Sequence, residues 1–202
     1  MRTRKCLILS PLFLIFNNDL SEITNVKESF KNQNILDLFR FDKIKSITEY
    51  KFNGYNINFV YLPKNIEKIE YCAFYKNQIQ ILDLSNCIKL KNIGENVFYE
   101  NKIKHLKLPD NIEEIYNYAF SINQIKILDL SNCIKLKEIN SNVFYENPLT
   151  EIKILNDIKI DYDNNYDYKD DVWNKFVKYY HKNDKKAGDY KLENNEWQWY
   201  PL

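Results

Sequence analysis

The sequence predicts an α/β-type solenoid that is mostly β. We expect a right-handed coil with one parallel sheet of about seven short strands, an irregular or short helical opposite side, and a C-terminal helix and β-hairpin as a cap. The first observation behind this is an internal repeat, because residues 60–105 align with residues 106–151 at an offset of 46 without a gap and about 29 positions are identical. The second is a short apolar pattern that returns at alternating steps of 22 and 24 residues. One short strand per turn cannot bury its apolar side alone, so stacked turns must share a core.

Each predicted strand carries the pattern apolar-x-x-apolar-x-apolar, with a small polar residue or cysteine three positions later. Strands are expected near residues 14, 36, 60, 82, 106, 128 and 152. Cys87 and Cys133 occupy the position after the strand, two turns apart. At about 4.8 Å per strand step their Cα atoms are expected about 9–10 Å apart, too far for a disulfide. We therefore interpret them as buried structural thiols.

The remainder of each coil repeats an aromatic residue and an asparagine. One phenylalanine per coil is predicted to fill its centre, and an asparagine follows three positions later in each case: Asn77, Asn101, Asn123 and Asn147. An asparagine side chain can bond backbone amide and carbonyl groups that a tight bend leaves without partners. Together with Cys87 and Cys133, this column is expected to be structural.

The shorter coils read Leu-Pro-x-x-Ile-x-x-Ile-x-x-x-Ala-Phe, from Leu62 to Phe74 and again from Leu108 to Phe120. This pattern resembles the BspA-like leucine-rich repeats. The resemblance covers residues 36–160 well and 14–35 loosely, and it implies a binding function and, for many members, a place on the cell surface.

We divide the chain into three parts. Residues 1–35 form an N-terminal segment that is either a weak signal or a degenerate first repeat, residues 36–160 hold the repeats, and residues 161–202 hold a linker and the cap. Within the cap, residues 170–182 place Trp173, Phe176, Val177 and Tyr180 on one face of a predicted helix. Asn194-Asn195 is a plausible two-residue hairpin turn. Such a cap covers the apolar core that the last coil would expose.

The N-terminus allows two interpretations. Basic residues followed by the apolar run Cys6 to Phe16 are typical of a secretory signal, but Asn17 to Leu20 offer no small-x-small cleavage site. The alternative is that Leu14 to Phe16 form the first strand. The localisation stays unknown: the missing cleavage site favours the cytoplasm, and the family resemblance favours a secreted or cell-surface protein. No other apolar run approaches the roughly 18 residues of a transmembrane helix, so none is expected.

Composition excludes several functions. Lys plus Arg number 29 and Asp plus Glu 28, a net charge of +1, which gives no electrostatic reason to expect a nucleic-acid partner. The three isolated glycines form no phosphate-binding motif. No cysteine pair has zinc-ligand spacing, and the acidic run Asp161 to Asp167 lacks the glycine and glutamate of an EF-hand. His105 has no serine or cysteine nucleophile near it. We therefore predict no metal, no cofactor and no enzymatic activity.

The outward side chains of the strands form two columns. One reads Asp37, Tyr61, Asp83, Lys107, Asp129 and Lys153, in which opposite charges on adjacent strands can pair. The other reads Phe59, Ile81, His105, Ile127 and Glu151. Exposed apolar residues gathered in this way often mark a partner site. Alternatively, a loop or tight curvature covers them.

The candidate partner-binding residues are Phe59, Tyr61, Ile81, Asp83, His105, Lys107, Ile127 and Asp129. We predict a monomeric, non-catalytic leucine-rich repeat protein whose strand face binds a protein partner of unknown identity. The alternative is a secreted or surface-attached adhesin that binds host or matrix proteins.

Overall fold

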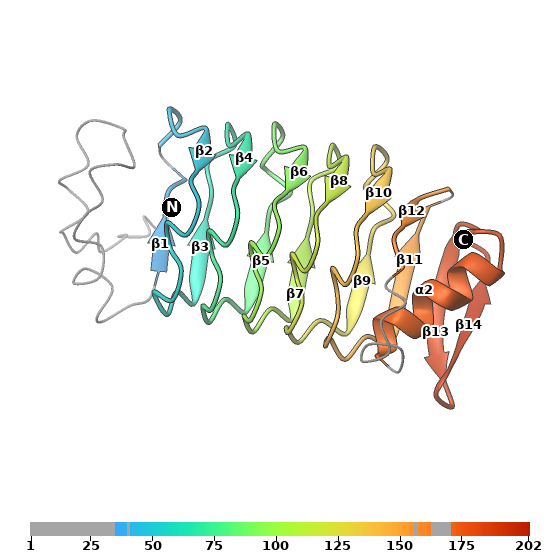
Figure 1. Ribbon diagram of the computed structural model, residues 1–202. Helices are drawn as coiled ribbons and strands as arrows, with labels where there is room; N and C mark the ends of the chain where they lie inside the picture. The colour runs from blue at the N-terminus through green and yellow to red at the C-terminus, as the bar shows by residue number, and fades with distance from the viewer. Residues whose placement is uncertain (1–34, 40, 156, 163–170) are drawn as a thin grey trace, which may run out of the picture.

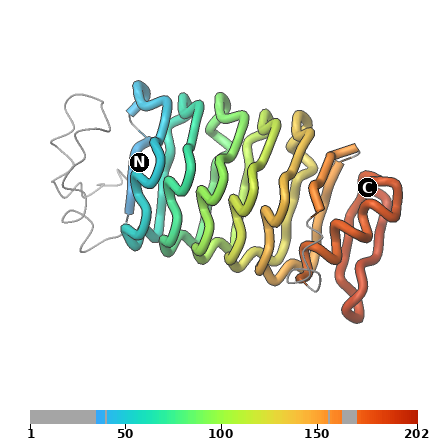
Figure 2. Tube along the Cα trace, in the orientation of Figure 1, coloured from blue at the N-terminus to red at the C-terminus, as the bar shows by residue number. Residues whose placement is uncertain are grey.

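The computed structural model describes residues 35–39, 41–155, 157–162 and 171–202 (Figure 1). Successive coils stack side by side in chain order, and the C-terminal cap lies at the end of the stack (Figures 1 and 2). The predicted fold class is confirmed. The expected strand at residues 14–16, the whole apolar run from Cys6 and most of the acidic run after Asp161 lie outside the described residues.

One strand of the main ladder comes from each coil. These strands are β1 (Ile35–Asp37), β3 (Phe59–Tyr61), β5 (Ile81–Asp83), β7 (His105–Lys107), β9 (Ile127–Asp129) and β11 (Glu151–Ile154). All pairings between them are parallel. Their middle residue points inward, as the apolar pattern predicts.

The number of paired residues between successive strands of the main ladder alternates. We call a step between fully paired strands tight and a step between barely paired strands loose. Strands 24 residues apart, such as β5 and β7, pair over three residues, whereas β3 and β5 pair only at Phe59 and Ile81. β7 and β9 belong to different sheets. At each tight step, the leucine after the first strand adds one more hydrogen bond to the next strand. Leu84, for example, donates its N–H to the Lys107 carbonyl at 2.9 Å. The equivalent leucines of the loose steps each precede a proline, which restricts their backbone.

A second parallel ladder lines the opposite side of the coils, where the sequence predicts irregular or short helical structure. Its strands have two residues each, and the second is always a buried isoleucine: β2 (Ser46–Ile47), β4 (Lys68–Ile69), β6 (Asn92–Ile93), β8 (Glu114–Ile115), β10 (Glu138–Ile139) and β12 (Lys159–Ile160). Two residues are too few to show the alternation by which strands are recognised in sequence.

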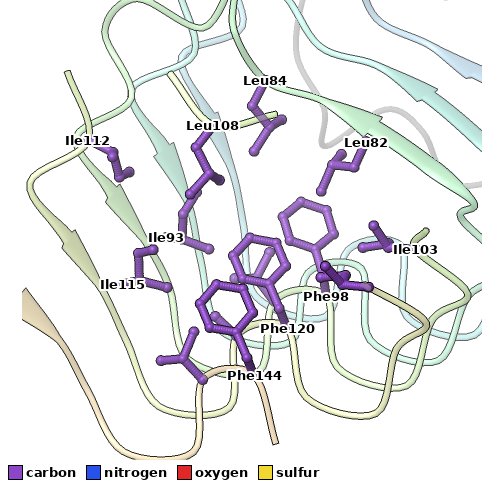
Figure 3. Packing of buried hydrophobic residues seen from close by; sticks show 14 of the residues in the cluster. Leu82, Leu84, Ile93, Phe98, Ile103, Leu108, Ile112, Ile115, Phe120 and Phe144 are labelled. Carbon is purple, nitrogen blue, oxygen red and sulfur yellow. The ribbon is translucent and has the colours of Figure 1, made fainter. Parts of the chain in front are cut away.

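A column of phenylalanine rings fills the centre of the solenoid. The centroids of Phe74 and Phe98 lie 5.3 Å apart, and the distance is 5.5 Å both from Phe98 to Phe120 and from Phe120 to Phe144. Figure 3 shows Phe98, Phe120 and Phe144 one behind another, with leucines and isoleucines of several coils around them. Each ring therefore contacts the ring of the next coil and joins neighbouring repeats into one core.

The asparagine column bonds the backbone beside these rings. The Asn101 Oδ1 accepts the Ile79 N–H at 3.1 Å, and its Nδ2 donates to the carbonyls of Phe74 at 2.9 Å and Phe98 at 3.2 Å. Asn77, Asn123 and Asn147 make the equivalent bonds. Each side chain thus bonds one carbonyl of its own coil and one carbonyl and one amide of the preceding coil.

The cap consists of α2 (Val172–Lys182), β13 (Gly188–Glu193) and β14 (Glu196–Tyr200). β13 pairs antiparallel with β11 and so covers the open edge of the last repeat strand. The Trp173 ring of α2 lies 5.0 Å from Phe144 and continues the aromatic column. Asn194 and Asn195, with φ of 50° and 66°, form the hairpin turn at the predicted position. In the described part of the chain, no helix is long and apolar enough to span a membrane.

Candidate partner-binding surface

The strands of the main ladder alternate in burial along their three residues. The middle residue is buried in β1, β3, β5 and β9, and its two neighbours are exposed. A strand must turn alternate side chains to opposite faces, so one face supplies the core and the other meets solvent. The positions x of the sequence pattern therefore form an outer surface, which we call the strand face.

An apolar row crosses the strand face at the first residue of each strand. The exposed fractions are 37% for Ile35, 37% for Phe59, 51% for Ile81 and 56% for Ile127. Ile35 lies opposite Phe59, and Phe59 lies opposite Ile81 in the ladder, so these three are adjacent. His105 interrupts the row before Ile127, and Tyr61, 53% exposed, lies two residues beyond Phe59. No described loop covers these side chains.

The second column of the strand face carries charge. Lys107 Nζ lies 3.9 Å from Asp83 Oδ2 on the adjacent strand, as the alternation of charges predicts. Lys153 instead pairs with Glu151 of its own strand at 3.5 Å. Asp83 also accepts hydrogen bonds from the backbone N–H of Ser85 at 3.0 Å and from its hydroxyl at 2.6 Å.

The pKa of Asp83 reflects two opposing effects. Partial burial raises it, but the hydrogen bonds from Ser85 and the charge of Lys107 outweigh burial, so the pKa lies below its ordinary value. The carboxylate is therefore fully ionised near neutral pH, and the strand face keeps fixed charges beside its apolar row.

Comparison of the sequence with known protein families tests the family resemblance of the repeated coils. The sequence matches the family described as BspA type leucine rich repeat region, in six copies over residues 23–90 and 45–170. The chain belongs to the BspA-type leucine-rich repeat family. No curated protein and no solved structure matches it.

A groove opens in the strand face of this BspA-type protein between β7 and β9. The coils are still joined where the Gln124 N–H donates to the Ile103 carbonyl at 2.9 Å, but they separate beyond it. The groove has a volume of about 1040 Å³. Its apolar lining includes Leu106, Leu108 and Ile127, and its polar lining is Ser85, Lys104, His105, Lys107, Asp110, Gln124, Lys126, Asp129 and Asn132.

The two cysteines of the structural column lie just beneath the strand face. Cys87 is 1% exposed and Cys133 is 2% exposed, and both are free thiols. Burial, and secondarily nearby aspartates, raises the pKa of each to about 12. Both thiols are thus protonated near neutral pH, the form that is inert as a nucleophile or metal ligand.

The structure places the predicted partner-binding residues in two groups on the strand face. His105, Lys107, Ile127 and Asp129 line the groove, whereas Phe59, Tyr61 and Ile81 lie on the strand face toward β1. Within the described ranges, no three His, Cys, Asp or Glu side chains are grouped so that they could hold a metal ion.

Reasoning from the sequence missed six polar residues of the groove: Ser85, Lys104, Asp110, Gln124, Lys126 and Asn132. Lys104, Gln124 and Lys126 precede their strands and so fall outside the repeating pattern that identifies outward positions. A signal for two of them was present, because the residues 46 positions earlier are Asn58 and Gln80. At exposed positions, differences between two similar blocks mark side chains that the fold itself leaves free to vary.

Proposed function

We propose that this BspA-type protein is a non-catalytic module that binds a protein partner on its strand face. The apolar row carries the proposal, since Phe59, Ile81 and Tyr61 gather their exposed surface on one side of a rigid ladder. Large exposed side chains in a cluster are favourable anchors because a partner removes their apolar surface from water. Membership of a repeat family whose solenoids generally serve interactions supports this.

The surroundings of the row favour a protein over a small molecule or a nucleic acid. Charged residues of both signs, such as Asp83 and Lys107, border the apolar side chains. An apolar centre with a mixed polar border is typical of protein–protein interfaces. A net charge of +1 gives no general attraction for a polyanion.

Two other exposed isoleucines serve as internal controls. Ile88 is 64% exposed and Ile134 is 73% exposed, each alone in the turn after a buried cysteine. Isolated apolar residues are common on soluble proteins and imply no partner.

The test replaces Phe59, Tyr61 and Ile81 by serine and measures partner binding beside wild type. Partners are first recovered with the tagged wild-type protein from its own cells and identified by mass spectrometry. We expect at least tenfold weaker binding of that partner by the variant, with an unchanged unfolding temperature. The control variant carries Ile88→Ser, Ile134→Ser and Tyr71→Ser and keeps wild-type binding. If the first variant unfolds, these side chains belong to the core, and if it binds normally, the strand face is not the interface.

A further inference from the structure

We infer that the groove between β7 and β9 binds an acidic, extended peptide segment of the partner, with a carboxylate against Lys104 and Lys126 and an apolar side chain on Leu106. This assignment rests on the proposed use of the strand face, and it names a partner chemistry at one place on it.

The groove is a local departure from the repeat. Leu106 is partly buried, whereas the equivalent residues of neighbouring coils, Leu82 and Leu128, are each 1% exposed. Val60, the corresponding residue 46 positions earlier, is 5% exposed. The apolar residue at this position is buried in the neighbouring coils. Partial exposure of Leu106 therefore leaves an apolar surface on which a ligand side chain can pack.

The rim of the groove carries an uncompensated pair of like charges. Lys104 and Lys126 each directly precede a strand, 22 residues apart, so they occupy the same position in adjacent coils. The other coils have Asn58, Gln80 and Thr150 there. Both lysines line the same groove, and like charges repel one another. Within the described residues, neither lysine forms an ion pair with a carboxylate of the chain.

This pair contrasts with the charge pattern elsewhere on the solenoid. Glu67 lies 3.7 Å from Lys45 and 4.0 Å from Lys89, and Glu113 lies between Lys91 and Lys137 in the same way. At these two places on the solenoid, acidic and basic side chains of successive coils therefore alternate. Two lysines that line one groove, neither within ion-pair distance of a carboxylate, therefore favour an anionic group from outside the chain as their partner.

Comparison of the two blocks shows that the change is concentrated at the groove. The residues 46 positions before Lys104, His105, Lys107 and Lys126 are Asn58, Phe59, Tyr61 and Gln80. The first set is basic or imidazole, and the second is neutral and partly aromatic. The strand face thus has an apolar half toward β1 and a basic half at β7 and β9.

A peptide fits the groove better than a free anion or a nucleic acid. Asp129 lies three positions after Lys126, which at about 3.3 Å per residue is roughly 10 Å, the length of a three- to four-residue extended segment. Along the two strands, Leu106 and Ile127 lie between the basic end and the last strand positions, Lys107 and Asp129. An acidic residue followed by an apolar residue therefore matches the lining, whereas a polyanion would meet Asp110 and Asp129 at the far end.

The test uses the fluorescein-labelled peptide Ser-Val-Glu-Leu-Ser-Val and the whole protein, with binding followed by fluorescence anisotropy. The chain supplies a conservative variant, Lys104→Asn with Lys126→Gln, because it places the same amides at Asn58 and Gln80. We expect this variant to bind the acidic peptide about tenfold more weakly, equivalent to about 1.4 kcal/mol. The matched control, Lys68→Gln with Lys135→Gln, removes two charges elsewhere and keeps wild-type affinity. A peptide with glutamine in place of glutamate binds wild type at least tenfold more weakly.

Several outcomes would overturn the assignment. These are no binding of the acidic peptide to wild type, an equal loss in both double variants, or displacement by inorganic phosphate beyond the effect of sodium chloride at equal ionic strength. A loss of partner binding in the Phe59, Tyr61 and Ile81 variant alongside any of these results would leave the proposed function standing and reject only the acidic peptide.

Discussion

At the scale of single residues, the asparagine column shows how a few side chains hold the bends of the solenoid. We predict that Asn101→Ala lowers the free energy of unfolding by about 3–5 kcal/mol, because the Ile79 amide and the Phe74 and Phe98 carbonyls lose buried partners. Urea denaturation measures the change. Asn65→Ala removes one exposed bond to the Asp42 carbonyl and is expected to cost less than about 1 kcal/mol. Equal losses in the two variants would contradict a special role for the column.

Each coil also holds a residue in the left-handed region at a position where glycine is favoured. Gly54 has φ of 71°, and the equivalent Lys76, Glu100, Ile122 and Glu146 have φ of 51–53° without being glycine. We predict that Glu146→Gly, at an exposed position, raises the free energy of unfolding by about 0.5–1 kcal/mol. Glu146→Ala removes the same side chain but keeps the backbone strain, so it gives no gain. A similar gain in both variants would assign the effect to the side chain.

Because the thiols of Cys87 and Cys133 are buried, we expect the free energy of unfolding to depend on pH in the alkaline range. The pKa of Cys87 and Cys133 is raised to about 12 in the folded protein, against about 8.5 in an unfolded chain. The resulting stabilisation is complete below about pH 8.5 and is lost as the pH rises toward 12. We predict that Cys87→Ala with Cys133→Ala is less stable than wild type at pH 7 and that the difference shrinks above about pH 8.5. Urea denaturation at pH 7 and above about pH 8.5 measures the difference in free energy of unfolding between wild type and variant. A difference that stays constant would show that neither thiol resists ionisation.

At the scale of elements, Asp171 links the start of the cap helix to the last coil. Asp171 accepts the Trp173 and Asn174 amides at the start of α2, and its second oxygen accepts the Glu146 amide at 3.0 Å. We predict that Asp171→Ala lowers the free energy of unfolding by about 1–2 kcal/mol and that Asp171→Asn, which keeps an acceptor, costs much less. Thermal unfolding at pH 7 measures both.

The same carboxylate gives this prediction a pH signature. Burial raises the pKa of Asp171, and the backbone hydrogen bonds offset it only in part. The part of its contribution that depends on protonation is therefore fully present below about pH 3.9 and is lost as the pH rises through the folded pKa, while the hydrogen bonds of the cap remain. On acidification, we expect the stability of wild type to rise relative to that of Asp171→Asn. A relative rise for the asparagine variant would instead mean that the pKa of Asp171 is lowered in the folded protein.

The elements differ in how far the sequence predicts them. The main ladder, the phenylalanine column and the hairpin turn at Asn194 follow from patterns that recur or that have one strong local signal. The second ladder does not, because a single isoleucine per coil, such as Ile93, shows no alternation. The opening between β7 and β9 also escapes the pattern, since Leu106 fits the leucine column as well as Leu82 does. Pairing between neighbouring strands depends on packing that the repeat alone does not specify.

At the scale of the whole molecule, the fold separates the core from the strand face. The aromatic column, the asparagines and the cap bond each coil to its neighbours inside the solenoid, while the strand face contributes little to that core. Side chains on the strand face can therefore differ between coils without cost to the fold, as Phe59 and His105 do at equivalent positions. This freedom is what a binding surface requires.

The most direct test of the strand face as the interface is site-specific photo-cross-linking in the protein's own cells. Tyr61, 53% exposed on the strand face, and Tyr71, 37% exposed outside it, are each replaced by p-benzoylphenylalanine. After irradiation, we predict a discrete covalent adduct with one partner protein from position 61 and none from position 71. An adduct from position 71 alone, or equal adducts from both positions, would contradict binding through the strand face.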